Sequence, residues 1–335
     1  MTIDIVILNY NTRELLEQLL PIVVQNSQME GVNIVVADNA STDGSAAWMK
    51  KHQPEIELIE LEQNHGFAGG YNLALQDRTA DYFILLNSDA EPAPNWLNPL
   101  LEFAKSHPEM GAAQPKLLDY YKREKFEYAG AAGGYLDHFG YPFCRGRIFG
   151  NVENNLGQYN ETKEVFWATG AAFFVSRAAW EKAEGLDDRF FAHMEEIDLC
   201  WRLQLLGYKN YSIPQSIVYH MGGGTLSNSS PRKTFFNFRN SLIMLYKNLP
   251  GDERDAVIIK RKLLDGLAAV FFLIQFKFAH IVQIWKAHKA FDQMKVSIKE
   301  KEGAKHLREI DTVLKSSLVF DYFLKGRKVF NELKF

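Results

Sequence analysis

The chain has 335 residues, of which 47% are hydrophobic, 24% charged and 13% aromatic, which suffices for one large domain with an appendage or for two modest domains. The apolar content excludes a disordered chain, and 23 glycines, 11 prolines and 2 cysteines exclude a collagen-like or a disulfide-rich scaffold. Residues 1–230 carry 17 basic and 30 acidic side chains (net −13), whereas residues 231–335 carry 21 and 11 (net +10), and an acidic body argues against a general nucleic-acid binder.

Predicted strands and helices alternate along the first hundred residues. Apolar runs predict strands covered on both faces, at 3–8, 32–37, 56–61 and 82–86. A first helix is predicted to follow Asn11, which with Glu14 resembles a capping box, and further helices are predicted at 45–52 and 70–76. The alternation indicates the α/β class, with a mostly parallel sheet, right-handed crossovers and helices on its faces.

Polar residues follow each of these four strands. They are Asn9-Tyr10-Asn11, Asp38-Asn39, Asn64-His65 and Asn87-Ser88-Asp89. Ligands of parallel sheets bind beyond the carboxyl ends of the strands. We therefore expect a ligand site at this edge of the sheet.

The second part of the chain is less regular. Residues 110–165 are rich in Gly, Tyr and Asn and receive no assignment. A strand is predicted at 166–176, a short helix at 178–183, a helix after Phe190 that ends near Gly207, and a late strand at 216–220. From Pro231 the pattern is helical to the end of the chain.

Cysteine usage and hydropathy bear on the compartment. Cys144 and Cys200 could form a single bridge, but two reduced thiols in a cytosolic compartment are expected. The N-terminal residues lack a basic segment and a small-residue cleavage site, so no secretory signal is expected. No stretch reaches the ~18 uninterrupted apolar residues of a spanning helix. These features favour a cytoplasmic protein.

The strand ends suggest a nucleotide site that lacks glycine-rich phosphate loops. The turn after the first strand contains no glycine, which excludes a dinucleotide fingerprint, and the chain has no P-loop motif. Asp38 is suited to ribose hydroxyls or a base N–H, and Tyr10 to stacking on a base. Alternatively, Asp38 serves only the turn at 38–44, because Asp and Asn favour turns.

A divalent cation site is predicted from Asp89 and His220. A carboxylate at a strand terminus can hold a hard cation against phosphate oxygens, and a neutral imidazole is a good metal ligand. Gly222 to Gly224 would let the chain move around a phosphate. The alternative is structural, with Asp89 as a helix cap before Glu91-Pro92 and His220 as a satisfied core residue.

A candidate general base lies in the acidic segment Glu195-Glu196-Ile197-Asp198. Clustered carboxylates repel one another, which raises the pKa of at least one of them. Asp198 can pair with Arg202 four residues later and is expected to be structural. Glu195 and Glu196 are expected to point into a cleft, although a solvated helix start is the alternative.

Five segments, in this order, resemble the motifs of family 2 glycosyltransferases, and most closely those of the bacterial rhamnosyltransferase-like subgroup. They are Asn9-Tyr10-Asn11, Asp38-Asn39-Ala40-Ser41-Thr42-Asp43-Gly44, Asn64-His65-Gly66-Phe67-Ala68-Gly69-Gly70-Tyr71-Asn72, Leu85-Leu86-Asn87-Ser88-Asp89, and Phe190 to Arg202. The resemblance covers about residues 3–245. Each motif alone is weak, but five in sequence are specific.

The resemblance implies a GT-A fold with a Rossmann-like sheet, a dTDP- or UDP-linked sugar donor, Mg²⁺ or Mn²⁺, and inversion at the anomeric carbon. It implies a catalytic domain at 1–245, with a donor half at about 1–110 and an acceptor half at about 111–245. The charge and the helical pattern of the tail add a basic amphipathic helical region at 246–335. Donor-binding residues carried over by position are Asn9, Tyr10, Asn11, Asp38, Asn64, Gly69, Asn72, Asn87, Ser88, Asp89 and Arg239. Acceptor-binding residues are Trp167, Gly170, Ala171 and Asp198, and the metal ligands are Asp89 and His220.

Two positions depart from the family pattern. Asn87 stands where many relatives have Asp, and Glu196 occupies the general-base position with one extra methylene. The implied reaction is a single displacement, in which Glu196, or else Glu195, takes a proton from an acceptor hydroxyl of a glycan or lipid-linked acceptor. The two departures leave a catalytically silent nucleotide-sugar binding module as an alternative. A sugar-phosphate nucleotidyltransferase is a further one, although the first loop lacks its glycine-rich, basic signature.

The basic tail contains an amphipathic stretch at 263–285. Its longest apolar run, 267–274, is too short to span a membrane but suits an interfacial helix. Lysines and arginines flank it and would attract anionic headgroups. A second helical pattern is predicted at 313–324. The alternative is a helical hairpin that packs on the catalytic domain or on a second subunit of an oligomer.

Overall fold

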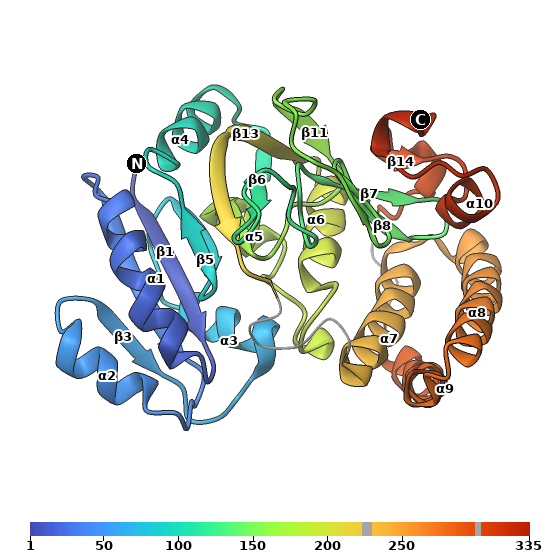
Figure 1. The fold of residues 1–335 in the computed structure, drawn as a ribbon, viewed down its shortest axis with the longest axis horizontal. Coiled ribbons are helices and arrows are strands. Elements are labelled where there is room, and N and C mark those ends of the chain that lie inside the picture. The colour runs from blue at the N-terminus through green and yellow to red at the C-terminus, as the bar shows by residue number, and fades with distance from the viewer. Residues whose placement is uncertain (223–229, 299–302) are drawn as a thin grey trace.

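The computed structural model describes residues 1–222, 230–298 and 303–335, and Figure 1 shows a central sheet with helices on both faces. In the order in which they pair, the main sheet contains β11 (Lys163–Val165), β13 (Lys209–His220), β6 (Met110–Asp119), β12 (Ala172–Ser176), β4 (Tyr82–Asn87), β1 (Ile3–Asn9), β2 (Val32–Asp38) and β3 (Glu57–Glu60). A short strand, β5 (Ala90–Pro92), pairs with β13. The predicted α/β class with a mostly parallel sheet is confirmed.

The strands that matter for the site run in one direction. β1 pairs in parallel with β2 and β4, and β13 pairs in parallel with β6. β12 runs the other way between β4 and β6, as do the short strands β5 and β11 beside β13. The register places Asn9 beside Asp38 and His220 beside Asp119. Polar residues from strands far apart in the chain therefore meet at one edge of the sheet.

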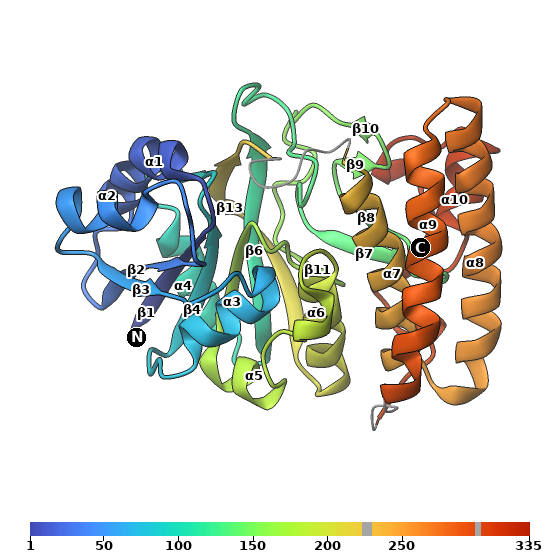
Figure 2. The same ribbon diagram turned by 90° about the horizontal axis from the view of Figure 1, so that it is seen from below.

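Two apolar cores cover the two faces of the sheet. Alternate residues of β1 divide between them, with Ile5 and Ile7 on one side and Val6 on the other. The first core includes side chains of α1 (Arg13–Asn26), α2 (Ser45–His52) and α4 (Leu97–Ser106). The second includes side chains of α3 (Gly66–Leu75), α5 (Arg177–Lys182), α6 (Glu195–Leu205) and α7 (Pro231–Asn248). Figure 2 shows α1 and α2 on one side of the sheet and α3 and α5 on the other.

The chain after Pro231 is not helical to its end, which corrects the prediction. A second sheet has the order β10 (Asn151–Val152), β9 (Arg147–Ile148), β8 (Pro142–Cys144), β7 (Gly134–Asp137) and β14 (Val313–Leu314). β14 pairs in parallel with β7, and only α10 (Leu318–Phe323) in the predicted pattern at 313–324 is helical. Val313 and Leu314 are buried because β14 pairs with β7 and covers an edge of the second sheet. The spacing of apolar residues in the sequence does not reveal this pairing.

The amphipathic stretch at 263–285 forms parts of two helices rather than one. α8 (Gly251–Ile274) and α9 (Phe278–Met294) are separated by a turn in which Phe276 has φ +57°. Ile284, Ala287 and Phe291 of α9 are buried, and the two helices stand beside α7 at the end of the molecule opposite β3 (Figure 2). Within the described residues, no helix is both long and apolar enough to cross a membrane.

Several predicted boundaries also change. Only residues 172–176 of the strand predicted at 166–176 are in a strand, β13 begins earlier than predicted, and α3 begins at Gly66 rather than at Gly70. The predicted capping box is wrong: Thr12 precedes α1 and makes no side-chain cap, and Asn11 has φ +54°. Cys144 and Cys200 are both free and buried.

Candidate active site

A cavity of about 530 Å³ lies beyond the carboxyl ends of the strands. It is lined by residues from distant parts of the chain, from Leu8 to Lys233. Many of the predicted site residues line it: Tyr10, Asn64, Asn87, Ser88, Asp89, Gly170, Ala171, Glu195, Glu196 and His220. Gly222 also lines the cavity, whereas Gly223 and Gly224 lie outside the described residues. Asp89, Glu196 and His220 thus share one cavity although they lie on three separate elements.

Asn9 and Asp38 connect the first two loops but do not line the cavity. The Asn9 amide donates to Asp38 Oδ1 at 2.7 Å, and the Ser41 backbone N–H donates to Asp38 Oδ2 at 2.9 Å. Both side chains are buried. The structure thus gives Asp38 the turn role that was the alternative to ribose binding. Asn39, its neighbour, does line the cavity.

Three other predicted donor residues have structural partners. Asn11 accepts a hydrogen bond from the Thr42 backbone N–H at 2.7 Å, and Asn72 donates to the Leu186 carbonyl at 2.7 Å. Gly69 is buried in α3, where an added Cβ would lie 3.0 Å from His65 Cβ. None of the three lines the cavity, so they shape the surrounding loops.

His220 lies between two carboxylates at the end of β13. Its Nε2 is 3.0 Å from Asp89 Oδ1, and its Nδ1 is 3.2 Å from Glu127 Oε1. Burial alone would lower the pKa of His220, but Asp89 and then Glu127 raise it to about 10. The two carboxylates therefore stabilise a positive charge at this point of the cavity.

Asp89 and His220 fit a divalent cation, which would take the place of the proton on His220 Nε2. A carboxylate and an imidazole are ligands that Mg²⁺, Mn²⁺ and related cations accept, and a carboxylate beside the second ring nitrogen is the usual way to orient a metal-binding histidine. In the described part of the chain, no group of three or more His, Cys, Asp or Glu side chains is arranged as a complete metal site. Asp89 and His220 would therefore supply only part of the coordination, and substrate oxygens would supply more of it.

Glu195 and Glu196 begin α6 and face the cavity. Oε2 of each carboxyl is buried and has no hydrogen-bond partner among the described residues. Burial raises the pKa of Glu196 to about 7. Burial and the charge of Glu196 raise the pKa of Glu195 well above its usual range. The two carboxyls therefore titrate as a pair, and the pKa of each lies above the usual range of a glutamate.

Asp198 belongs to a buried ion-pair network, which corrects its assignment to acceptor binding. Its Oδ2 accepts from Arg202 Nε and from Lys247 Nζ, each at 2.8 Å, and Asn248 donates to its Oδ1 at 2.8 Å. Burial opposes ionisation, but Lys247 and Arg202 lower the pKa of Asp198. The predicted Asp198–Arg202 pair is confirmed, and the network joins α6 to α7.

Trp167 also lies away from the cavity. Its indole N–H donates to the Tyr135 carbonyl at 3.1 Å, and the ring lies where a side chain on Gly134 would be. Trp167 therefore packs the second sheet against the main core. Gly170 does line the cavity. A Cβ on this residue would lie 3.1 Å from Phe67 Cζ and 3.8 Å from Glu196 Cβ.

The loop before α6 has a strained backbone. Phe191, His193 and Met194 have φ values of +63°, +70° and +75°. Such values cost about 1–3 kcal/mol each in residues other than glycine and persist only where the surroundings enforce them. The loop ends at Glu195, so its backbone conformation sets the position from which the side chains of Glu195 and Glu196 face the cavity.

Arg239 and Asn240 hold this loop, which corrects the assignment of Arg239 to the donor. The Asn240 amide donates to the carbonyls of Phe190, Ala192 and His193 at 3.0, 2.8 and 2.7 Å. Arg239 Nη2 donates to the Phe190 carbonyl at 2.9 Å and to that of Arg189 at 3.0 Å. Arg239 does not line the cavity. We call this arrangement the Arg239–Asn240 clamp.

Several residues at the site escaped the sequence analysis. Glu127 lies in the unassigned region 110–165, and no strand or helix pattern there marked it. His193 lines the cavity, and burial, followed by the charge of Lys233, lowers its pKa to about 4, so it is neutral at physiological pH. The carbonyl of Phe191 accepts from the N–H of Phe67 at 2.6 Å. The signal for Phe191 and His193 was their place in the motif that precedes the acidic pair.

The amino-acid sequence matches a known family and named relatives. The profile of glycosyl transferase family 2 matches residues 4–182. N-acetylglucosaminyl-diphospho-decaprenol L-rhamnosyltransferase of Mycobacterium tuberculosis is 26% identical over 204 residues, which is 56% of this chain and 66% of that protein. The hexosyltransferase Agl10 of low-salt glycan biosynthesis in Haloferax volcanii is 26% identical over 60% of this chain and 61% of its own. The chain thus spans just under two thirds of the length of these curated relatives.

Solved structures share the fold. Residues 1–349 of S. aureus TarS in complex with UDP-GlcNAc superpose with a TM-score of 0.55 at 14% identity, over 94% of this chain and 84% of that fragment. The mannosyltransferase PcManGT of Pyrobaculum calidifontis, solved with GDP-Man and Mn²⁺, gives 0.53 at 14% identity over 86% of each chain. The expected GT-A fold is confirmed. With the family profile matching more than half of its residues, this chain belongs to glycosyl transferase family 2.

Proposed function

We propose that this protein is an inverting glycosyltransferase that moves a sugar, with rhamnose as the first candidate, from a nucleoside-diphosphate donor to a hydroxyl group in cell-surface glycan synthesis. The observation that carries the proposal is that Asp89, His220 and Glu196 line the same cavity. Two of these residues suit a diphosphate with its cation, and the third suits a proton acceptor. Membership of the family supports sugar transfer as the reaction class.

The proposed reaction is a single displacement at the anomeric carbon. Glu196 accepts a proton from the acceptor hydroxyl while that oxygen attacks, and the diphosphate leaves from the opposite face of the sugar. The raised pKa of Glu196 suits this role, because a base with a pKa near the working pH transfers protons efficiently. Asp89 and His220 would hold a divalent cation, which offsets the charge on the departing diphosphate.

The nucleoside is proposed to bind near Tyr10 and Asn39. Both line the cavity at the ends of β1 and β2, and Tyr10 is partly exposed, so its ring can stack on a base. Thermal-shift measurements with dTDP, UDP and GDP, each with Mn²⁺, test this step, since a ligand that binds only the folded state raises Tm. One nucleotide should stabilise the protein and the others should not. A failure of all three to raise Tm would refute donor binding.

The acceptor is proposed to be a glycan or a lipid-linked sugar. One relative is named for a diphospho-decaprenol acceptor and for rhamnose transfer, which makes a polyprenyl-linked N-acetylglucosamine and dTDP-rhamnose the first pair to test. Transfer of labelled sugar to this acceptor should depend on both substrates. Release of free sugar from every donor without transfer to any acceptor would contradict the proposal.

Peripheral contact with an anionic membrane is a further part of the proposal. Exposed apolar side chains of α8 and α9 include Leu267 (61% exposed), Phe271 (54%), Ile274 (70%) and Trp285 (63%), and the tail has a net charge of +10 by the counts above. The opposite faces of these helices pack on α7, so the predicted hairpin packing and membrane contact are compatible.

Flotation with liposomes tests this contact. Deletion of the tail is unsuitable because β14 and Leu318 belong to the core of the second sheet. The double variant Leu267→Ser and Ile274→Ser should lose association with phosphatidylglycerol liposomes. Leu156→Ser, at a position that is 85% exposed but lies outside the helices, should keep it. Equal flotation of all three proteins, or none, would remove the membrane contact.

A further inference from the structure

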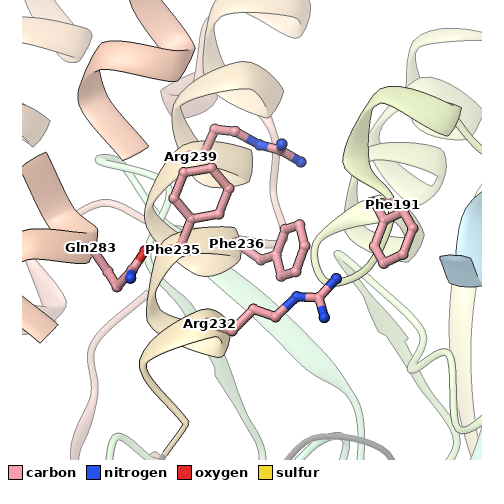
Figure 3. Close-up of a pocket in the computed structure, with 6 residues that line it drawn as sticks. All are labelled: Phe191, Arg232, Phe235, Phe236, Arg239 and Gln283. Carbon is pink, nitrogen blue, oxygen red and sulfur yellow. The ribbon is translucent and has the colours of Figure 1, made fainter. Parts of the chain in front are cut away.

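A second cavity, of about 580 Å³, lies between α7, α9 and the strained loop. Its lining contains two arginines and three aromatic rings: Phe191, Arg232, Phe235, Phe236, Arg239 and Gln283. Figure 3 shows Arg232 reaching from α7 toward Phe191, with the ring of Phe236 beside it and Gln283 on the far side. We call it the arginine pocket. The two arginines are seven residues apart in one helix and therefore share a face.

The arginine pocket carries positive charge without a carboxylate. Among the described residues, neither Arg232 nor Arg239 has an acidic partner in an ion pair. Arg239 Nη2 donates to the carbonyls of Arg189 and Phe190, and its Nε donates to Asn240 Oδ1. Its Nη1 makes no hydrogen bond within the described part of the chain. Among the described residues, Arg232 lies over two aromatic rings, with its Cζ 5.7 Å from the ring centroid of Phe191 and 5.6 Å from that of Phe236. Paired guanidinium groups of this kind suit a phosphate or diphosphate.

The arginine pocket adjoins the cavity that contains Glu196. Phe191 and Arg232 line both of them. An anion bound by Arg232 would therefore lie where the two cavities meet. Asp89 and His220, the proposed residues for the donor diphosphate, do not line the arginine pocket, so the two positions are separate.

An apolar tip lies at the same end of α7. The hydroxyl of Thr234 lies 2.7 Å from His280 Nδ1, which ties the start of α9 to the turn of α7 that contains Arg232. Around this contact, large apolar side chains are exposed: Ile274 (70%), Phe276 (80%), Phe278 (56%) and Val282 (48%). A ligand with a phosphate at one end and a hydrocarbon chain next to it matches this combination.

We propose that Arg232 and Arg239 bind the phosphate group of a lipid-linked acceptor, whose hydrocarbon chain lies against the apolar tip at 274–282. This inference rests on the proposed function, because it supplies the acceptor site for that reaction. It commits to a prenyl-type phosphate rather than a free anion, since the charged pocket and the exposed rings adjoin one another.

Binding of geranyl diphosphate to the full-length protein tests the inference. The donor site is first saturated with the nucleoside diphosphate that raises Tm, so that the probe cannot bind at Asp89 and His220. Arg232→Gln should weaken binding about tenfold or more, the scale of a charge-assisted contact. The matched control Lys286→Gln removes an exposed charge of α9 outside the arginine pocket and should leave the affinity unchanged.

Further measurements distinguish binding of the diphosphate head group from binding of the hydrocarbon chain of the probe. Phe276→Ser with Phe278→Ser should weaken geranyl diphosphate but not inorganic diphosphate, and geraniol should bind more weakly than geranyl diphosphate. Equal affinities of Arg232→Gln and Lys286→Gln would overturn the phosphate site, and inorganic diphosphate binding as tightly as geranyl diphosphate would overturn the lipid. Binding of the nucleoside diphosphate is measured before the lipid is added, so its failure to raise Tm of the wild type would refute the proposed function instead.

Discussion

Replacement of Glu196 by Gln is expected to lower turnover but to raise the free energy of unfolding above neutral pH. Glu196 is the proposed proton acceptor, and a glutamine of the same shape cannot accept the proton. We expect turnover to fall by about 10²-fold or more, the usual scale for a positioned base. In the wild type, kcat/KM should rise as pH rises through about 7, because only the carboxylate form of Glu196 is active. The variant should lose this rise.

The same burial that raises the pKa of Glu196 costs stability above neutral pH. Its pKa is raised from 4.5 in the unfolded chain to about 7 in the fold. The folded state therefore binds the extra proton between these pH values, and the free energy of unfolding decreases with rising pH across this window. At about 1.4 kcal/mol per unit, the cost of ionised Glu196 above pH 7 is about 3 kcal/mol.

Urea unfolding at two pH values isolates this cost. At pH 5 the wild-type carboxyl is protonated and resembles the amide, so packing differences between Glu and Gln appear there. The increase in the free energy of unfolding caused by Glu196→Gln should be larger at pH 8 than at pH 5 by about 2.5 kcal/mol, because the unfolded carboxyl is already partly ionised at pH 5. Acetate and Tris buffers of matched ionic strength keep the comparison independent of screening.

Glu195→Gln is the matched control. Burial and the charge of Glu196 raise the pKa of Glu195 and so favour its protonated form, which the amide resembles, and turnover should stay within about tenfold of the wild type. A large loss in Glu195→Gln with near-normal turnover in Glu196→Gln would transfer the base role to Glu195. An identical stability difference at pH 5 and pH 8 would refute the raised pKa itself.

Three further outcomes are expected. EDTA should abolish sugar transfer and Mn²⁺ or Mg²⁺ should restore it, with His220→Ala needing more metal than the wild type; full activity in EDTA would count against the cation site. Asn240→Ala removes three hydrogen bonds to the strained loop. In steady-state kinetics it should lower kcat at least tenfold and change the donor KM less than about twofold. A change in the donor KM alone would indicate that this residue serves donor binding instead. Gly66→Ala should lower the free energy of unfolding, measured in urea, by about 2 kcal/mol or more. The reason is that Gly66 has φ +71° and that the new Cβ would lie 2.4 Å from the Phe191 carbonyl oxygen. An unchanged free energy of unfolding would show that the loop at Phe191 shifts to make room.

Local sequence patterns predicted the strands of the first hundred residues well. The apolar runs at 3–8, 32–37 and 82–86 are strands of the sheet, because each run is buried on both faces and needs no distant partner to be recognised. The late strand at 216–220 was found for the same reason, although β13 starts at Lys209. By contrast, β14 is only two residues long, and its pairing with β7 spans most of the chain.

The sequence also indicated the edge where polar side chains meet, but side-chain directions within the loops depend on distant packing. Asp198 and Trp167 carry the right chemistry for an acceptor site, yet buried partners turn both away from the cavity. Arg239 was expected at the donor and instead holds the loop at Phe190. None of these partners is recognisable from local spacing.

The amino-acid sequence by itself determined the alternation of elements, the polar strand ends and the acidic start of α6, since each is a local pattern of burial or charge. Only the tertiary structure decided that Glu127 flanks His220, that Asn240 holds the strained loop and that Arg232 and Arg239 face a separate pocket. The physical reason is that hydrogen bonds and desolvation act between atoms in contact. Folding brings residues 50 or more positions apart into that contact, as for Asn240 and Phe190.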